Sequence, residues 1–546
     1  MSEASQAGVR QPRGLSGLRD VRSWPAWGWL LLATIVSFLL HLPFFGLPMI
    51  SDEGGYAYVA QRWIDGRGEL YDNIWVSRPQ GIFLAYGLIF KTIGTSIDAI
   101  RLGAWVFSAL TLIFVWLFAN AWAGRRVAIV ATLLFALISG SPAIEGFTAN
   151  AEVFMALPAA AAAWLLLRAC RQGWGRVSLI GVGALAGLAT VLKPSGVVMI
   201  PIAIAFVALT SLDGNRAILR RSLWIVLGVA IIAAPTLIHG WMIGWHQFIF
   251  ASVTYRLEYQ SSTTVSAMHH VRAIGKLFHR TWMVLLLVSV VVNAQYRLAG
   301  RRFAARQWFA RLAEAPRAGI VAQPSFQSAN RYDGADGDVL LRLLLLGSFA
   351  GIAMGGDWWY HYLVQILAPF AIWFAPVLLD LKDRMTRNWQ VVLLIATLFV
   401  FLLPYSVVRR GSAGDMSHAL FNHPGYPAQQ QVANYLRSHT EPETPIFVAF
   451  DQAALYYLSD LPSTYRYMYD QELRAMPGAE DELIAMIESP YRPVYIVGTR
   501  QRAPFPDRGQ AFWNAVSENY HLESMVRGVP IFRANEPLKY HYTDLG

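Results

Sequence analysis

Long apolar segments recur along roughly the first 410 residues, and they constrain the fold of this chain more than any other feature. Each segment approaches the ~20 residues that an α-helix needs to cross a lipid bilayer. The 546 residues are 55% hydrophobic and only 15% charged, and the mean hydropathy is +0.37. A soluble protein is rarely so apolar. The sequence therefore predicts a polytopic α-helical membrane protein.

The apolar segments predict about eleven membrane spans. We expect them at about residues 26–47, 97–120, 127–142, 152–169, 177–192, 195–211, 222–244, 281–296, 339–356, 362–380 and 389–408. A polar stretch at about 49–80 follows the first span and leads into the segment GIFLAYGLIFKTIG. That segment has about 14 residues, which is short for a span, so we predict an interfacial or re-entrant helix in the first outer loop.

Basic residues between the apolar segments indicate how the chain crosses the membrane. The net charge is +10, but most arginines lie in these connections, so we interpret them as topology signals rather than as a nucleic-acid site. If the short segment does not cross, Arg125 and Arg126 fall in the cytoplasm, as the positive-inside rule favours. The basic tail, residues 1–25, is then inside. The first span has no small-residue cleavage site and is expected to remain as an anchor in the cytoplasmic membrane.

The character of the chain changes after about residue 410. Residues 26–410 are expected to form the membrane domain, and residues 411–546 to form an extracytoplasmic α/β domain. Helical patterns such as DELIAMIES alternate there with short apolar strands such as PIFVAF and PVYIVG. The single cysteine, Cys170, excludes an intramolecular disulfide and a cysteine-based zinc cluster.

The predicted topology brings ionisable residues from distant segments to one membrane boundary, the outer one. These residues are Asp52, Glu53, Arg78, Glu145, Glu152, Lys193, Asp357 and His361. Ionisable groups beside hydrocarbon are expensive, so a function is their first explanation. Carboxylates could carry acid/base chemistry, and cations could hold an anionic group such as phosphate. The set therefore predicts a membrane enzyme.

Each residue also has an alternative explanation that is purely structural. Asp52 could open a helix, since Asp favours helix N-termini, and Glu152 could do the same. Arg78 and Lys193 could extend their charges to the headgroups. His361 lies among aromatic residues, including Tyr360, that could form an interfacial belt.

Other residues and motifs give less indication of a function. His269 and His270 are expected in an outer loop at about 245–280, with no recognisable metal-binding spacing. The chain has no Walker motif, no Rossmann glycine fingerprint and no zinc signature.

The order of several segments resembles the GT-C membrane glycosyltransferases. These segments are SDEGGYAYVAQRWIDGRGELYDNIWVSRPQGIFLAYGLIF, TANAEVFMALPAAAAAWLLLRA, GLATVLKPSGVVMIPIA and WYHYLVQILAPFAI. The chain looks most like the bacterial dolichyl-phosphate-mannose-protein mannosyltransferase-like proteins of glycosyltransferase family 39, and is similar to the aminoarabinose transferase of lipid A. The resemblance covers about residues 26–410 and implies the GT-C fold.

The resemblance implies a sugar donor linked to polyprenyl phosphate and an acceptor hydroxyl on a lipid, glycan or protein. It assigns catalytic roles to three carboxylates: Asp52, its neighbour Glu53 and, as the second acidic position, Glu152. It implies that Arg78 and Lys193 contact the donor phosphate.

The same resemblance assigns His361, with its neighbour Tyr360, to the residues that bind the donor phosphate. One in-line displacement would invert the anomeric centre. No resident cofactor follows from the resemblance, and a divalent metal stays open. The alternative class is a polytopic lipid or glycan transporter or flippase, which would place its charges nearer the middle of the bilayer.

Overall fold

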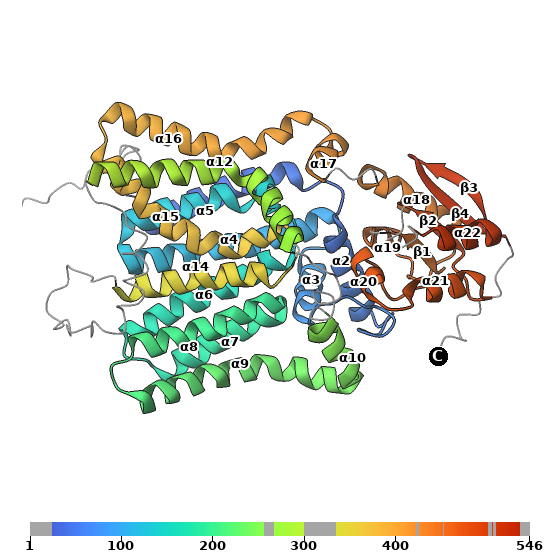
Figure 1. The fold of residues 1–546 in the computed structure, drawn as a ribbon, viewed down its shortest axis with the longest axis horizontal. Coiled ribbons are helices and arrows are strands. Elements are labelled where there is room, and N and C mark those ends of the chain that lie inside the picture. The colour runs from blue at the N-terminus through green and yellow to red at the C-terminus, as the bar shows by residue number, and fades with distance from the viewer. Residues whose placement is uncertain are drawn as a thin grey trace, which may run out of the picture.

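A computed structural model describes residues 24–255, 267–299, 335–356, 358–421, 425–450, 452–500, 505 and 509–535. An elongated bundle of helices occupies one end of the molecule, and a smaller domain of helices and strands occupies the other (Figure 1). Asp357 and most of the predicted N-terminal tail lie outside the described residues.

The helices of the bundle coincide with the apolar segments of the sequence. They are α1 (Ala26–His41), α4 (Ile97–Ala123), α5 (Arg125–Ser139), α6 (Ala151–Arg171), α7 (Arg176–Leu192), α8 (Met199–Thr210), α9 (Asn215–Ile243), α12 (Ala267–Ala299), α14 (Ala335–Ala353), α15 (Val364–Arg384) and α16 (Arg387–Leu402). Within the described residues, six segments are long and apolar enough to cross a membrane, or seven if a bent pair within α12 counts as one span. The count of eleven spans stays a prediction.

Small residues let neighbouring helices of the bundle approach closely. A side-chain carbon on Gly183 of α7 would lie 1.9 Å from the Ile225 carbonyl oxygen, and one on Gly228 of α9 would lie 2.0 Å from the Ile180 carbonyl oxygen. The backbones of α7 and α9 therefore pack directly against each other, as glycine permits in helices surrounded by lipid.

The outer loop expected at about 245–280 is partly helical. α10 (Trp245–Ile249) and a π-helical turn (Phe250–Thr254) follow α9, and α12 already begins at Ala267. Apolar residues at Val271, Ile274 and Leu277 recur with helical spacing, which explains why the helix begins before the apolar span. The positions of His269 and His270 are thus in a helix rather than a loop, and their side chains lie outside the description.

Two short helices lie between the bundle and the smaller domain (Figure 1). They are α2 (Ser51–Ile64), inside the stretch that the sequence suggested only as polar, and α3 (Gly81–Thr92). Glu53 stabilises the start of α2, because its carboxylate accepts the free backbone N–H of Ile50 at 3.1 Å. Helix α3 has 12 residues, too few to span the hydrocarbon layer by itself.

The C-terminal part contains a four-stranded sheet in the order β1-β2-β4-β3. The strands are β1 (Ile446–Ala449), β2 (Tyr495–Gly498), β3 (Tyr520–Val526) and β4 (Val529–Ala534). β1 and β2 are parallel, while β4 pairs antiparallel with both β2 and β3. The sequence did not indicate β3, because His521 and Glu523 interrupt its apolar residues and a register shift at Leu522/Ser524 breaks the alternation.

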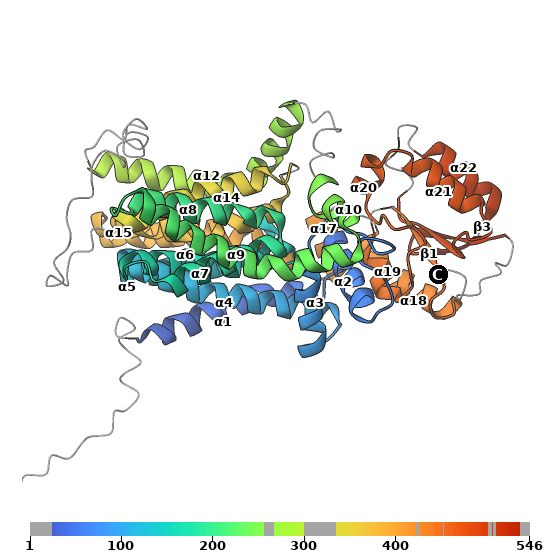
Figure 2. The ribbon, with the colours of Figure 1, turned by 90° about the horizontal axis from the view of Figure 1, so that it is seen from below.

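Helices cover both faces of this sheet. The helices of the region are α17 (Ala413–Phe421), α18 (Gln429–His439), α19 (Ala454–Ser459), α20 (Asp470–Ala475), α21 (Ala479–Glu488) and α22 (Gln510–Asn519). Figure 2 shows α21 and α22 on one side of the sheet and α18 and α19 on the other. β1 and β2 are buried along their whole length, which explains their unbroken apolar sequences.

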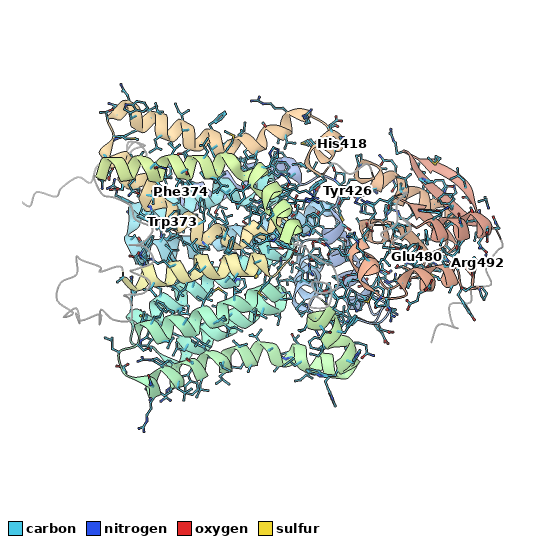
Figure 3. All side chains as sticks on the ribbon, in the orientation of Figure 1. Trp373, Phe374, His418, Tyr426, Glu480 and Arg492 are labelled. Atoms are coloured by element: carbon cyan, nitrogen blue, oxygen red, sulfur yellow. The ribbon has the colours of Figure 1, made fainter. Side chains whose placement is uncertain are left out.

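The C-terminal domain docks directly on α2 and its flanking loops. A side-chain carbon on Gly54 would lie 2.2 Å from the Ala454 Cα, so α2 and α19 touch through their backbones. The Tyr426 hydroxyl accepts the Ser51 backbone N–H at 3.4 Å, and Tyr426 lies near this junction (Figure 3). The domain therefore rests on the helix that begins with the acidic pair.

Candidate active site

Asp52 lies in the first turn of α2, at the end of the bundle that faces the C-terminal domain. Its side chain is 32% exposed, whereas the neighbouring Glu53 is completely buried. Its Oδ2 atom lies 3.9 Å from His361 Nε2. A partly exposed carboxylate at a helix start can receive a proton from a ligand.

His361 joins three carboxylates from distant parts of the chain. It lies in the short helical turn Tyr360–Leu363 that leads into α15. Its Nδ1 atom is 3.1 Å from Glu145 Oε2, and its Nε2 atom is 3.8 Å from Glu152 Oε1 and 3.9 Å from Asp52 Oδ2. The structure thus brings His361 into the centre of the predicted acidic group.

Lys193 lies at the break between two short helices of the bundle. It ends α7 in an extended conformation, with φ −150° and ψ 131°, and a turn at Pro194–Val198 leads into α8. Its ammonium group contacts Glu152 Oε1 and lies 4.0 Å above the ring of Tyr362. The break between α7 and α8 places this cation at the end of the bundle.

Arg78 approaches the same region from the loop before α3. Its Nε atom donates to the Tyr56 hydroxyl at 3.0 Å, and its Nη1 atom donates to the Ser77 carbonyl at 2.8 Å. Among the described residues it has no carboxylate partner within 4.0 Å. Burial lowers the pKa of Arg78, but Tyr56, Asp52 and Tyr362 raise it more, so the net pKa lies above its ordinary value and the group stays charged.

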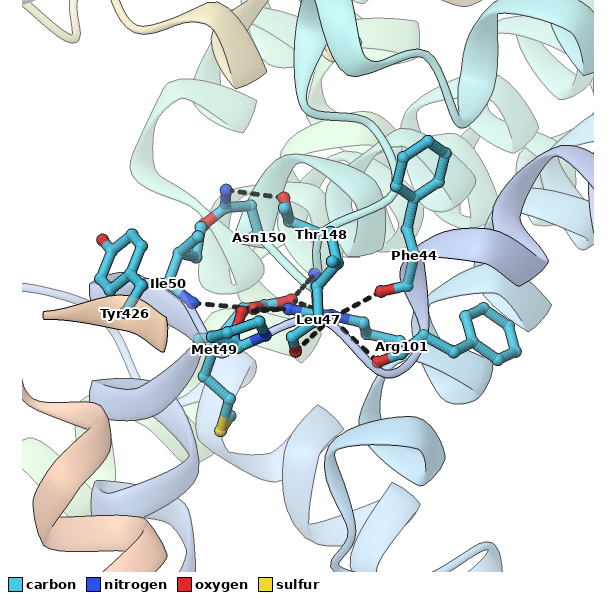
Figure 4. A network of polar contacts seen from close by, with 12 residues as sticks. Phe44, Leu47, Met49, Ile50, Arg101, Thr148, Asn150 and Tyr426 are labelled. Carbon is cyan, nitrogen blue, oxygen red and sulfur yellow. Dashed lines mark hydrogen bonds and ion pairs between the residues drawn. The ribbon is translucent and has the colours of Figure 1, made fainter. Parts of the chain in front are cut away.

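Glu53 belongs to a buried network beside the site rather than to its exposed part. Figure 4 shows this network around Arg101 and Ile50. Its two oxygens accept Arg101 Nε at 3.1 Å and Arg101 Nη2 at 2.8 Å, and they also accept the backbone N–H groups of Ile50 and Ala149. Both side chains of the Glu53–Arg101 pair are 0% exposed. This pair fixes the start of α2 against α4 and the α5–α6 loop.

The remaining bonds of Arg101 extend the same network into the segment before α2. Its guanidinium donates to the carbonyl oxygens of Phe44, Phe45, Leu47 and Pro48. These bonds hold the chain between α1 and α2, so the direction in which α2 starts is fixed from both sides.

Tyr360 lies at the edge of the group, under a cation that the sequence did not suggest. The Arg280 guanidinium carbon is 4.2 Å above the Tyr360 ring, and Arg280 Nη1 lies 3.2 Å from Glu145 Oε1. Glu145 therefore contacts both Arg280 and His361.

The structure brings most of the expected residues together. Asp52, Glu152, Lys193 and His361 form one connected set, with Glu145 as a further member. Four residues that complete the surroundings were not expected from the sequence: Tyr56, Arg101, Arg280 and Tyr362. An arginine within the otherwise apolar segment 97–120 was a usable signal for Arg101, because charges in such segments need partners.

The donor set does not form a recognisable metal centre in the part of the chain that the structure describes. No group of three or more His, Cys, Asp or Glu residues there could hold a metal ion. The carboxylates instead contact Lys193, Arg280, Arg101 and His361. The arrangement can offer a proton acceptor at Asp52 and a cation at Arg78 to one ligand.

A family model described as dolichyl-phosphate-mannose-protein mannosyltransferase matches residues 77–239. A search of curated protein sequences finds no match.

Solved structures share the fold over nearly the whole chain. ArnT from Cupriavidus metallidurans, bound to undecaprenyl phosphate, is 14% identical, with a TM-score of 0.59 over 93% of this chain and 98% of that chain. The oligosaccharyltransferase AglB from Archaeoglobus fulgidus, in complex with an inhibitory peptide and a dolichol-phosphate, is 12% identical, with a TM-score of 0.51 over 94% of this chain and 75% of that chain. The chain is thus similar to this mannosyltransferase family over residues 77–239, and it shares the fold of ArnT and AglB over nearly its whole length.

Proposed function

We propose that the protein transfers a hexosyl or pentosyl group from a polyprenyl-phosphate-linked donor to an acceptor hydroxyl. The acceptor belongs to a cell-envelope lipid, glycan or protein. The observation that carries this proposal is the position of the partly exposed Asp52 at one end of the bundle. Asp52 is near enough to Arg78 to raise its pKa, and it is linked to Lys193 through His361 and Glu152. Transfer from a lipid phosphate needs both a proton acceptor and cations beside the leaving group.

In this mechanism, Asp52 accepts the proton of the acceptor hydroxyl while the hydroxyl oxygen attacks the anomeric carbon in line. The bond from that carbon to the phosphate oxygen breaks, and its electron pair leaves with the polyprenyl phosphate. Arg78, which has no carboxylate partner among the described residues, stabilises the negative charge of the leaving group. A single displacement inverts the anomeric centre.

The other residues take supporting roles. Glu152 holds the Lys193 ammonium at the break after α7 and so keeps a second cation beside the phosphate. His361 orders the carboxylates around it, with Tyr360 next in the chain. Glu53, which we first expected to be catalytic, is proposed as a positioning residue, because all four of its accepted hydrogen bonds come from Arg101 and the backbone.

We propose that the site faces the outside of the cytoplasmic membrane. The bundle then holds about eleven spans, with the N-terminal tail of residues 1–25 inside and the domain of residues 411–546 outside. The ion pairs Arg126–Asp383 and Arg171–Asp336 join connections on the bundle end away from α2. Basic connections on that end support a cytoplasmic location for it.

The test uses the purified full-length protein in lipid nanodiscs with labelled undecaprenyl-phosphate-linked hexoses and pentoses, and a native membrane extract as the source of acceptor. We expect release of undecaprenyl phosphate with transfer of the label for at least one sugar. Arg78→Ala should weaken donor use at least roughly tenfold, since a charge-assisted hydrogen bond to phosphate is lost. Arg409→Ala, which removes an exposed arginine after α16, is the matched control. Neither transfer nor lipid-phosphate release with any donor would contradict the proposal and favour a transporter.

A further inference from the structure

The C-terminal domain places one buried hydroxyl group beside the candidate site without a partner. The Tyr469 hydroxyl oxygen is shielded from solvent, and it has no hydrogen-bond partner among the described residues. A buried polar group without a partner is unfavourable, so such a group calls for a ligand or a role. Tyr469 lies directly before α20 and belongs to no element of the membrane bundle.

The chain carries this hydroxyl to the start of α2. A side-chain carbon on Gly55 would lie 1.7 Å from the Tyr469 oxygen and 2.6 Å from its ring carbon Cζ. Any residue larger than glycine at position 55 would displace the tyrosine. Gly55 is three residues after Asp52, so the hydroxyl of the C-terminal domain lies within the first turns of the helix that carries the proposed base.

A second contact joins the segment before Arg78 to the segment before Tyr469. Trp75 and Tyr467 form a parallel backbone bridge. The centroids of their rings are 5.0 Å apart, and the ring planes are nearly perpendicular. The segment that leads to Arg78 and the segment that leads to Tyr469 therefore pass each other in the same direction at this bridge. The backbone of Tyr469 is fixed in turn, because its carbonyl accepts the N–H groups of Glu472 and Leu473.

The charges around Tyr469 define what its hydroxyl can bind. Burial first, and then the negative charge of Asp52, raise the pKa of Tyr469 well above its ordinary value, although Arg78 acts in the opposite direction. The group is therefore a neutral O–H donor at any physiological pH. A neutral donor next to a guanidinium complements an anionic oxygen, because it adds a hydrogen bond to the attraction of the cation.

We infer that the Tyr469 hydroxyl donates a hydrogen bond to a phosphate oxygen of the lipid donor that Arg78 holds. This inference rests on the proposed function, and it makes the C-terminal domain a part of the donor site. Tyr469 is then a positioning residue whose partner arrives with the substrate.

The test measures binding of undecaprenyl phosphate to the full-length protein in nanodiscs, with undecaprenol as the matched lipid without phosphate. Tyr469→Phe removes only the hydroxyl and should weaken binding of undecaprenyl phosphate roughly tenfold, as for a hydrogen bond to a charged group. Binding of undecaprenol should not change. Tyr467→Phe is the control, since it makes the same chemical change two residues away and should bind both lipids like the wild type.

The outcomes separate this inference from the proposed function. If the wild type binds undecaprenyl phosphate and Arg78→Ala weakens it, but Tyr469→Phe binds like the wild type, the role of Tyr469 is overturned while the proposed function stands. An equal loss for undecaprenol in Tyr469→Phe would also overturn it, because a damaged fold affects both lipids. If the wild type binds undecaprenyl phosphate no better than undecaprenol, the proposed function and this inference both fail.

Discussion

The two adjacent carboxylates of α2 should differ in their effect on the stability of the protein when each is replaced by its amide. Glu53→Gln keeps the size of the side chain but removes the charge that faces Arg101. Each carboxylate oxygen of Glu53 accepts one N–H from Arg101 and one from the backbone, at 2.8–3.1 Å. An amide nitrogen in either position would face two N–H donors, which then lose their acceptor.

The loss of stability follows from these contacts. Each buried donor without a partner costs about 1–3 kcal/mol, and removing one member of a buried ion pair typically costs about 3–5 kcal/mol. We therefore expect Glu53→Gln to lower the free energy of unfolding by about 3–5 kcal/mol. Asp52→Asn should cost less than about 1 kcal/mol, because Asp52 is 32% exposed and its nearest ion-pair partner, His361 Nε2, is 3.9 Å away.

Thermal unfolding of the purified protein in detergent, followed by tryptophan fluorescence, measures the difference. Glu53→Gln should melt several degrees below the wild type, whereas Asp52→Asn should melt with it. Glu69→Gln, on the exposed loop after α2, is the control for the loss of a surface charge. Equal melting temperatures for Glu53→Gln and the wild type would refute the assignment of Glu53 to a structural pair.

Two further changes test the site and its contact with the C-terminal domain. Lys193→Met should reduce donor turnover at least roughly tenfold, since it removes a cation and the lysine that pairs with the buried Glu152. Initial rates with a labelled donor measure this change, and a loss below twofold would exclude Lys193 from the site. Gly55→Ala should loosen the docked domain, because its methyl group would meet the Tyr469 oxygen at 1.7 Å. Limited proteolysis should detect this, and Gly46→Ala, with open space around it, should behave like the wild type. Unchanged proteolysis of Gly55→Ala would show that the domain does not dock as described.

Much of the membrane bundle could be predicted, because a bilayer imposes the same requirement on every span. Apolar length and basic connections located the helices, and the Lys-Pro step at Lys193 marked the break between two of them. Helix α2 was harder to predict. Its glycines Gly54 and Gly55 weaken the helical signal, and they are explained only by contacts with Ala454 and Tyr469 some 400 residues later.

The roles within the site depended on contacts that a sequence does not show. Asp52 and Glu53 are adjacent carboxylates of similar chemistry, and only burial separates them. The partner of Glu53 is Arg101, 48 residues later in the chain. The neighbour of Asp52 is instead His361, in the turn before α15. The shared boundary of these residues could be predicted from topology, but which of them pair with each other could not.

The most direct test of this account is turnover by Asp52→Asn at saturating donor. The same nanodisc preparation should bind undecaprenyl phosphate within about threefold of the wild type, because Arg78 and Lys193 are intact, while sugar transfer should fall at least about a hundredfold, as expected for loss of a general base. Asp72→Asn, an exposed residue of the following loop, should transfer sugar like the wild type. Retention of most of the transfer activity by Asp52→Asn would contradict the claim that this carboxylate is the catalytic base.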